Sequence, residues 1–203
     1  MTIDLLDRPI THAVAIGETA DVMASILDPA VQLALWRRDR PAALDWIDAL
    51  EWDAIDDIDA HIVGPDFGAA IGPLLSDAGY LQTAQGRALC DEVAGLATRF
   101  AQVVDAAGLR LRLEVIETDA CRKFHMDQVT ARLLMPLSGP GTQWIETALG
   151  KDAPVNQLAV GKVGIFKGRL WVEEPAILHR SPPVATTGQT RLLLVLDPHG
   201  ESA

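Results

Sequence analysis

Cysteine and long apolar runs are scarce in this sequence of 203 residues. Its two cysteines, Cys90 and Cys121, are too few to build the disulfide framework of a small secreted protein. Because no run reaches the roughly 18 apolar residues that a membrane span needs, we expect no transmembrane helix. The first residues, MTIDLLDRPI, include acidic residues where a signal peptide would have a basic start. We therefore expect a soluble, cytoplasmic protein.

Basic residues are also few. The chain has 17 Lys and Arg residues against 28 Asp and Glu residues, which gives a formal net charge of −11. An acidic protein repels phosphate backbones, and the sequence offers no basic patch, so we expect no nucleic-acid partner. Signatures of other enzyme classes, such as a nucleophile elbow or a phosphate loop, are missing as well. A small-molecule or protein substrate remains as the expected partner, and the sequence leaves a homodimer open.

Residues 1–108 are predicted to be mainly helical. Asp28-Pro29 has the character of an N-cap followed by proline, and residues 31–50 are rich in Ala, Leu and Trp. The pairs Gly64-Pro65 and Gly72-Pro73 indicate a loop region. A second helix is predicted over residues 83–107, with Gly108 as its C-cap. Its apolar residues recur at spacings of three and four; they are Leu89, Val93, Leu96, Phe100 and Val103.

The pattern changes after Gly108. Apolar and charged residues alternate from Leu109 to Val115, which is typical of a strand. Short apolar runs separated by turn residues then predict strands at 131–137, 155–160, 163–166, 169–172, 176–178 and 190–196. Many short strands with evenly spaced turns indicate a β-barrel or sandwich in residues 109–203.

The candidate site begins with His125 and Asp127, which form a His-x-Asp motif. Residues two apart on a strand point to the same face, so both side chains can reach one ion. A second imidazole, His179, follows much later and precedes the pair Pro182-Pro183. Two imidazoles and one carboxylate are the facial triad with which non-haem oxygenases hold Fe(II). We therefore predict that His125, Asp127 and His179 bind one divalent metal ion, preferably Fe(II), and carry the catalysis.

Arg191 opens the last predicted strand. The order His-x-Asp, distant His and then this Arg resembles the Fe(II)/2-oxoglutarate-dependent oxygenases over residues 109–197. The resemblance implies Fe(II), 2-oxoglutarate as co-substrate, and a double-stranded β-helix, a cupin-like jelly-roll barrel. It also implies that Arg191 binds the distal carboxylate of 2-oxoglutarate, which suits a guanidinium because it binds carboxylates bidentately. The expected fold class is α+β, with a helical N-terminal region (1–108) packed on a double-stranded β-helix (109–203) in one compact unit.

Three short runs also resemble a bacterial family of unknown function that spans nearly the whole chain. They begin at Cys121, Leu137 and His179 and read CRKFHMD, LSGPGT and HRSPP. The name of that family supplies no reaction.

One feature of many 2-oxoglutarate oxygenases is missing. They place a Tyr on the strand before His-x-Asp to help hold the co-substrate, whereas this chain has Ile116 near that place and only one Tyr, Tyr80. Lys123 lies two residues before His125 and would point to the same face of a strand. We therefore expect Lys123 to bind a carboxylate of the co-substrate in place of the missing Tyr. Arg132 has two interpretations, as an inward substrate contact or as an outward residue in a salt bridge.

Two alternatives stand beside the oxygenase. The triad could hold zinc or manganese for a cupin-type hydrolase or isomerase, with the metal activating water. The barrel could also be a non-catalytic metal-binding or regulatory module. The sequence does not identify the primary substrate in any of these cases.

Overall fold

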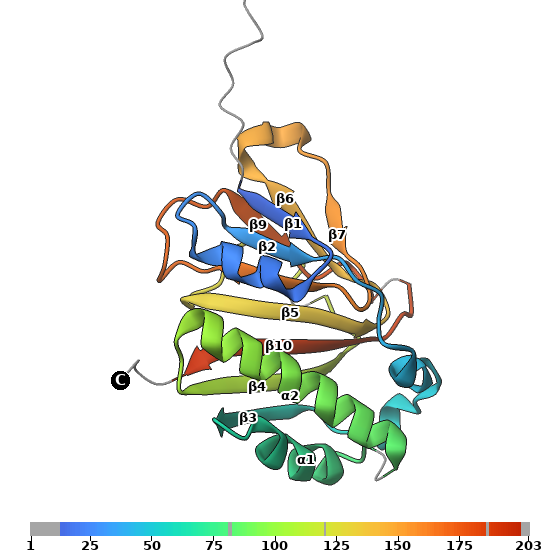
Figure 1. Ribbon diagram of the computed structural model, residues 1–203. Coiled ribbons are helices and arrows are strands. Elements are labelled where there is room, and N and C mark those ends of the chain that lie inside the picture. Colours follow the sequence, from blue (N-terminus) through green and yellow to red (C-terminus); the bar gives the residue numbers. More distant parts are fainter. Residues whose placement is uncertain (1–12, 81–82, 120, 186, 200–203) are drawn as a thin grey trace, which may run out of the picture.

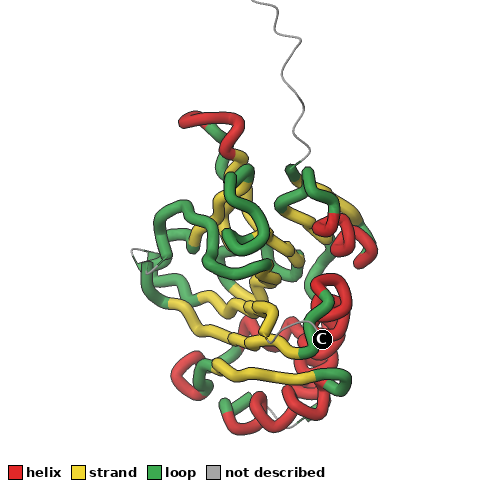
Figure 2. Tube along the Cα trace, turned by 90° about the vertical axis from the view of Figure 1, so that its left-hand side faces the viewer, coloured by secondary structure: helices red, strands yellow, loops and turns green. Residues whose placement is uncertain are grey.

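The structure, a computed structural model, describes residues 13–80, 83–119, 121–185 and 187–199. Within these residues, a seven-stranded sheet faces a three-stranded sheet. Two helices, α1 (Phe67–Asp77) and α2 (Ala84–Val104), cover the outer face of the larger sheet (Figure 1). In the view from the side, α2 lies at the right, outside the sheets (Figure 2). The fold is therefore a mixed α+β arrangement of three layers in which sheet predominates. None of the helices in the described ranges is long and apolar enough to cross a membrane.

Both sheets are almost wholly antiparallel, and among the strands of the described ranges only β1 and β2 pair in parallel. The larger sheet has the spatial order β1 (Val14–Gly17), β2 (Leu33–Trp36), β8 (Val163–Lys167), β5 (Ala131–Ser138), β10 (Arg191–His199), β4 (Gly108–Ile116) and β3 (Ile58–Val63). The smaller sheet has the order β7 (Asn156–Leu158), β6 (Thr142–Glu146) and β9 (Ile177–Arg180). Short 3-10 helices lie between them: η1 (Ala20–Leu27), η2 (Ala42–Ala49), η3 (Trp52–Ala54) and η4 (Thr147–Asp152).

Strand β10 shows how one strand separates two hydrophobic cores. Leu192, Leu194 and Leu196 belong to the core between the larger sheet and the helices. Leu193 and Val195 point the other way and belong to the core between the two sheets. Successive side chains on a strand alternate between faces, so a strand buried on both sides is apolar at nearly every position. This explains the continuous apolar run at the C-terminal end of the sequence.

The helix predicted over residues 83–107 is confirmed as α2. The side chain of Thr83 caps its start by accepting a hydrogen bond from the main-chain N–H of Gln85 at 3.3 Å. The predicted cap at Gly108 is wrong, because the helix ends at Val104 and Asp105 adopts the left-handed conformation with φ 51°. Gly108 instead begins β4, where it pairs with both neighbouring strands.

The predicted helix over residues 31–50 is wrong. Residues Leu33–Trp36 form β2, which pairs with β1 on one side and β8 on the other. Ala and Leu favour helices, but burial of a short apolar strand between two neighbours outweighs that preference. The remainder of the segment contains the 3-10 helix η2, which begins after Pro41.

A further correction concerns the region around residues 64–73, which the sequence indicated as a loop. It contains α1, whose start is capped by Asp66 through a hydrogen bond from the N–H of Ala69 at 3.0 Å. Pro73 lies inside the helix and costs it a main-chain hydrogen bond, but burial of the apolar face outweighs that loss. The N-terminal half thus mixes α- and 3-10 helices with strands β1, β2 and β3, so a mainly helical region packed on a separate barrel is not confirmed.

Most strands predicted after residue 108 are confirmed, as β4, β5, β7, β8, β9 and β10. The strand predicted at 169–172 is wrong, because these residues form a turn whose main chain bonds to the segment around Asp127. Strand β6 was not predicted, because its sequence mixes polar and apolar residues beside the Gly139–Gly141 turn. Strands from both parts of the chain share the larger sheet, since β2 pairs with β8 and β3 with β4.

Candidate metal centre

The two histidines of the site are brought together by their main chains. His179 lies in β9, where it pairs with Trp144 of β6. On its other side it forms an isolated antiparallel bridge with His125, and their N–H groups and carbonyls bond reciprocally at 2.9 and 3.0 Å. His125 is therefore fixed at the open edge of the smaller sheet, although the segment that carries it forms no regular strand. The imidazole rings lie 4.8 Å apart.

Asp127 lies in a loop that a neighbouring turn supports. The N–H of Arg169 donates to the carbonyl of Asp127 at 2.9 Å, and the N–H of Gly168 donates to that of Thr130 at 2.8 Å. A Cβ on Gly168 would lie 2.0 Å from the carbonyl oxygen of Val129, so only glycine allows the two segments to approach this closely. The turn after β8 thereby fixes the main chain that carries the carboxylate.

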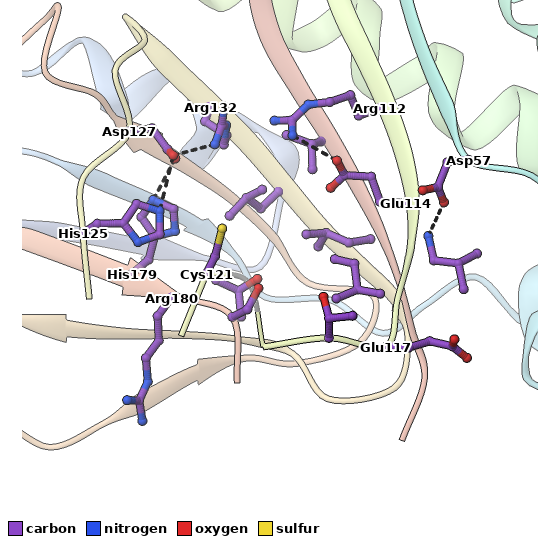
Figure 3. Close-up of a pocket in the computed structure, with 18 residues that line it drawn as sticks. Asp57, Arg112, Glu114, Glu117, Cys121, His125, Asp127, Arg132, His179 and Arg180 are labelled. Atoms are coloured by element: carbon purple, nitrogen blue, oxygen red, sulfur yellow. Dashed lines mark hydrogen bonds and ion pairs between the residues drawn. The ribbon is translucent and has the colours of Figure 1, made fainter. Parts of the chain in front are cut away.

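The side chains of His125, Asp127 and His179 converge. One potential ligand atom from each lies within 4.8 Å of the others (Figure 3). Nε2 of His179 is 2.9 Å from Oδ2 of Asp127, and Nε2 of His125 is 3.5 Å from Oδ1. Donors at right angles and about 2.0–2.2 Å from one ion would lie roughly 3 Å apart. The spacing and chemistry of the three donors therefore fit a divalent metal ion.

The orientation of both rings agrees with ligation through Nε2. Nδ1 of His125 lies 2.8 Å from the carbonyl oxygen of Lys123, to which it donates when the ring is neutral. That bond leaves Nε2 with a free lone pair directed at the carboxylate, as in many metal-binding histidines. The ring of His179 packs against Phe166 with centroids 4.9 Å apart, which restricts its rotation.

The electrostatics favour an ionised carboxylate. Burial by itself would raise the pKa of Asp127, but the imidazoles of His125 and His179 and the guanidinium of Arg132 hold it far below its usual value. The pKa of His125 is raised, chiefly by its contact with Asp127. Asp127 is thus an ionised carboxylate that can serve as the anionic ligand of a cation, with Arg132 as its neighbouring positive charge.

A cavity of about 390 Å³ opens beside the three residues. Its floor is the inner face of the larger sheet, with Leu134 from β5 and Leu193 and Val195 from β10. Figure 3 shows the imidazoles and Asp127 on one side of this pocket and Glu114 and Glu117 across from them. A molecule bound there would contact the candidate metal ligands and an apolar surface at once.

Arg191 lies fully buried directly behind the cavity wall. Its guanidinium donates to the hydroxyls of Thr142 at 3.0 Å and Ser181 at 3.2 Å, and both of those residues line the cavity. Among the described residues, no carboxylate lies within ion-pair distance of it, although the negative charge of Glu114 acts on it from farther away and raises its pKa. Its Nε has no hydrogen-bond partner in that part of the chain. Burial lowers its pKa to about 10, so the side chain remains a cation at neutral pH.

The other residues for which the sequence suggested a role are Lys123, Ile116, Tyr80 and Arg132, and only some of them reach the cavity. The side chain of Lys123 is exposed and does not line the cavity, so the structure does not bring it to Arg191. Ile116 lines the cavity, whereas Tyr80 is buried in the core beneath the helices. Arg132 points inward, but it pairs with Asp127 and Asp197.

Asp197 and Arg112 are further neighbours of the site that were not predicted from the sequence. Asp197 bonds to both Arg132 and Arg112, and Arg112 lines the cavity. Asp197 could have been found from the alternation of side chains along a strand, because it lies on the same face of β10 as Arg191 and Leu193. No comparable signal identified its partners, which come from other strands.

Comparison with solved structures finds proteins that share the overall fold of this chain. The dioxygenase for auxin oxidation 1 from Arabidopsis thaliana, in a binary complex with 2-oxoglutarate, superposes with a TM-score of 0.51 at 9% identity, covering 93% of this chain and 92% of that one. A prolyl-4-hydroxylase from Pseudomonas putida gives a TM-score of 0.50 at 11% identity, covering 90% and 99%. At such low identities the likeness shows a shared fold alone.

Comparison of the sequence gives one family and no curated relative. The model of the family described as "Protein of unknown function (DUF1826)" matches residues 17–197. None of the curated proteins compared with the sequence matches it.

Proposed function

We propose that this chain, which belongs to the family of proteins of unknown function described as DUF1826, is an Fe(II)- and 2-oxoglutarate-dependent dioxygenase. His125, Asp127 and His179 would hold the ion on one face and leave the opposite positions for ligands. We interpret the two facing sheets as the double-stranded β-helix of such enzymes, which agrees with the fold shared with the two solved structures.

Arg191 is the observation that carries this proposal. Burying a charge without a counter-ion is costly, and native proteins seldom do so without a partner or ligand. Here the buried guanidinium has two hydroxyls as its hydrogen-bond acceptors, and the residues that carry them, Thr142 and Ser181, line the cavity. A dicarboxylate that enters the cavity can place one carboxylate there and direct its 2-oxo acid end toward the metal ligands. The geometry therefore favours 2-oxoglutarate over a ligand with one carboxylate.

The overall reaction converts a C–H bond of the substrate, dioxygen and 2-oxoglutarate into a C–OH group, carbon dioxide and succinate. When bound, the ferrous ion supplies the redox chemistry. The protein contributes the rest: Arg191 with Thr142 and Ser181 orients the co-substrate, and the apolar floor of Leu134, Leu193 and Val195 limits water near the reacting carbon.

Binding measurements test this role of Arg191. Calorimetry under anaerobic conditions, with the protein loaded with Fe(II), should show 2-oxoglutarate binding much more tightly than 2-oxobutyrate, which lacks the distal carboxylate. Because the preference depends on the guanidinium, Arg191→Met should remove it. Arg110→Met is the matched control, because Arg110 pairs with Asp59 at an exposed position outside the cavity. Equal affinities for the two acids in the wild-type protein would contradict the proposal.

Hydrolase or isomerase chemistry with zinc or manganese is the competing hypothesis. It requires the three metal ligands but gives no role to a buried cation behind the cavity. Elemental analysis of protein purified without added metal separates the two, since iron supports the oxygenase and zinc supports the alternative. Succinate release on addition of ferrous ion and 2-oxoglutarate would decide for the oxygenase, and metal binding without either turnover or 2-oxoglutarate binding would favour a regulatory module.

A further inference from the structure

The two carboxylate oxygens of Asp127 have different neighbours. Oδ1 forms an ion pair with Nη1 of Arg132 at 2.6 Å (Figure 3). Oδ2 is buried and lies 2.9 Å from Nε2 of His179, one of the two candidate imidazole ligands, whereas Nε2 of His125 lies 3.5 Å from Oδ1. Oδ1 is therefore already engaged by a cation of the protein, whereas Oδ2 has no such cation beside it and makes the shorter of the two contacts with an imidazole nitrogen.

Arg132 is itself held firmly from the opposite side. Its Nε and Nη2 form a bidentate pair with Oδ1 and Oδ2 of Asp197 at 2.7 and 2.8 Å. Asp197 is buried and also accepts a hydrogen bond from Nη2 of Arg112 at 3.2 Å. Burial lowers the pKa of Arg132, but its contacts with Asp197 and Asp127 raise it above the ordinary value, so the guanidinium stays charged.

These partners connect a loop to the rigid sheet. Arg132 lies at the start of β5, Asp197 in β10 and Arg112 in β4, which are adjacent strands of the larger sheet. Asp127 lies outside the strands, and its main chain is fixed by the turn after β8. A bidentate guanidinium–carboxylate pair restricts rotation as well as distance. Through Arg132, the side-chain orientation of Asp127 is thus fixed by the sheet.

We propose that Arg132 is a positioning residue for the metal ligand Asp127. By holding Oδ1, it makes Asp127 a donor of one oxygen, Oδ2, and prevents the carboxylate from turning to chelate the ion with both. This inference rests on the proposed metal site, but it does not depend on the identity of the co-substrate or of the substrate. It assigns Arg132 a role in ligand geometry, with Asp197 as the residue that orients it.

Two physical effects of Arg132 on metal affinity have opposite signs. A cation near the ion repels it, so removal of the charge alone would tighten metal binding. Loss of positioning would weaken it, and changes in residues that orient metal ligands typically cost about 10–100-fold in affinity. A purely structural role would lower the stability of the fold and leave the affinity of the folded protein unchanged. The sign of the change therefore separates the three interpretations.

The test measures cobalt binding to the full-length protein without 2-oxoglutarate. Cobalt(II) affinity is obtained by competition with a chelating dye, and the visible absorption of bound cobalt reports the ligand geometry. Arg132→Gln removes both the positive charge and the planar guanidinium that contacts Asp127 and Asp197. Arg132→Lys keeps the charge but removes the guanidinium. Arg110→Gln is the matched control, because it removes an exposed bidentate Arg–Asp pair from the same sheet. Circular dichroism confirms the fold of each variant.

We expect both Arg132 variants to bind cobalt about 10–100-fold more weakly, with altered absorption, and Arg110→Gln to match the wild type. Tighter binding by Arg132→Gln would overturn the proposal in favour of simple repulsion. Wild-type affinity and spectrum in Arg132→Lys would overturn it as well. If Arg132→Gln does not fold, Arg132→Lys alone decides. Failure of the wild-type protein to bind any divalent ion would instead refute the metal site, and with it both proposals.

Discussion

The main chains of His125 and His179 form two reciprocal hydrogen bonds, with N···O distances of 2.9 and 3.0 Å. Because of this bridge, an imidazole from an irregular segment lies beside an imidazole from β9. Main-chain bonds do not depend on a bound ion, so the ligand group is assembled by the fold itself. A preformed site binds its ligand with little loss of conformational freedom.

Metal binding should therefore stabilise the folded protein. A divalent ion supplied at a free concentration 100 times its Kd should raise the free energy of unfolding by about 2.7 kcal/mol, because the ion binds only the folded state. Asp127→Asn should abolish most of this gain, since the anionic ligand is lost. Urea denaturation with and without Co(II) measures it. An equal gain in the wild-type and variant proteins would mean that the ion binds elsewhere.

A second prediction concerns Gly168 and the support of Asp127. Gly168→Ala places a Cβ 2.0 Å from the carbonyl oxygen of Val129, so the two segments must separate. We expect a loss of about 1–3 kcal/mol in stability together with weaker cobalt binding. Gly95→Ala is the control, because Gly95 lies in α2 with open space around a new Cβ and should gain about 0.4–1 kcal/mol. Unchanged cobalt affinity in Gly168→Ala would show that the turn does not position the ligand.

The parts of the fold that the sequence predicted have strong local signals. Helix α2 has a regular apolar stripe, and β4 alternates between apolar and charged residues, so each pattern had one interpretation. Strand β2 has no such signal, because a short buried strand and a buried helical segment are both continuously apolar. Only its position between β1 and β8 decides its structure, and that position depends on contacts with residues far away in the sequence.

For the candidate site, the metal-ligand residues could be predicted from the sequence, but the residues that orient them could not. The ligand types and their order, from His125 to Asp127 to His179, were visible in the sequence because the chemistry of a facial triad limits the choice. The contacts that orient them were not, since Arg132 and Asp197 meet only through the pairing of β5 with β10. Lys123 was expected as an anchor from strand parity, but the segment is not a regular strand and the side chain is exposed.

A pH-dependent contribution is predicted for Asp48. The guanidinium of Arg40 lies 2.6 Å from its Oδ2, and this hydrogen bond holds the pKa of Asp48 below its ordinary value. Since the unfolded value is about 3.9, the contribution to stability is complete above that pH and is lost as the pH falls through the lowered folded pKa. Comparison of Asp48→Asn with the wild type should show a difference of about 1 kcal/mol or less near pH 7.

That difference should shrink at the acid end of a denaturation series between pH 7 and 3, because protonated Asp48 no longer pairs with Arg40. Asp53→Asn, at an exposed position, is the control and should follow the wild type throughout. A difference that grows as the pH falls would reverse the assigned sign.

The cysteines provide a final test of the cavity. Cys121 is exposed and lines the cavity, whereas Cys90 is partly buried and burial raises the pKa of its thiol. Iodoacetamide should therefore label Cys121 first, because the thiolate is the reactive form and the thiol of Cys90 yields less of it. Bound Co(II) with 2-oxoglutarate should slow the labelling of Cys121, since the ligands occupy the same cavity, and leave that of Cys90 unchanged. Peptide mass spectrometry measures both rates. Equal protection of both thiols would indicate general stabilisation of the fold, and no protection of Cys121 would place the ligand outside this cavity.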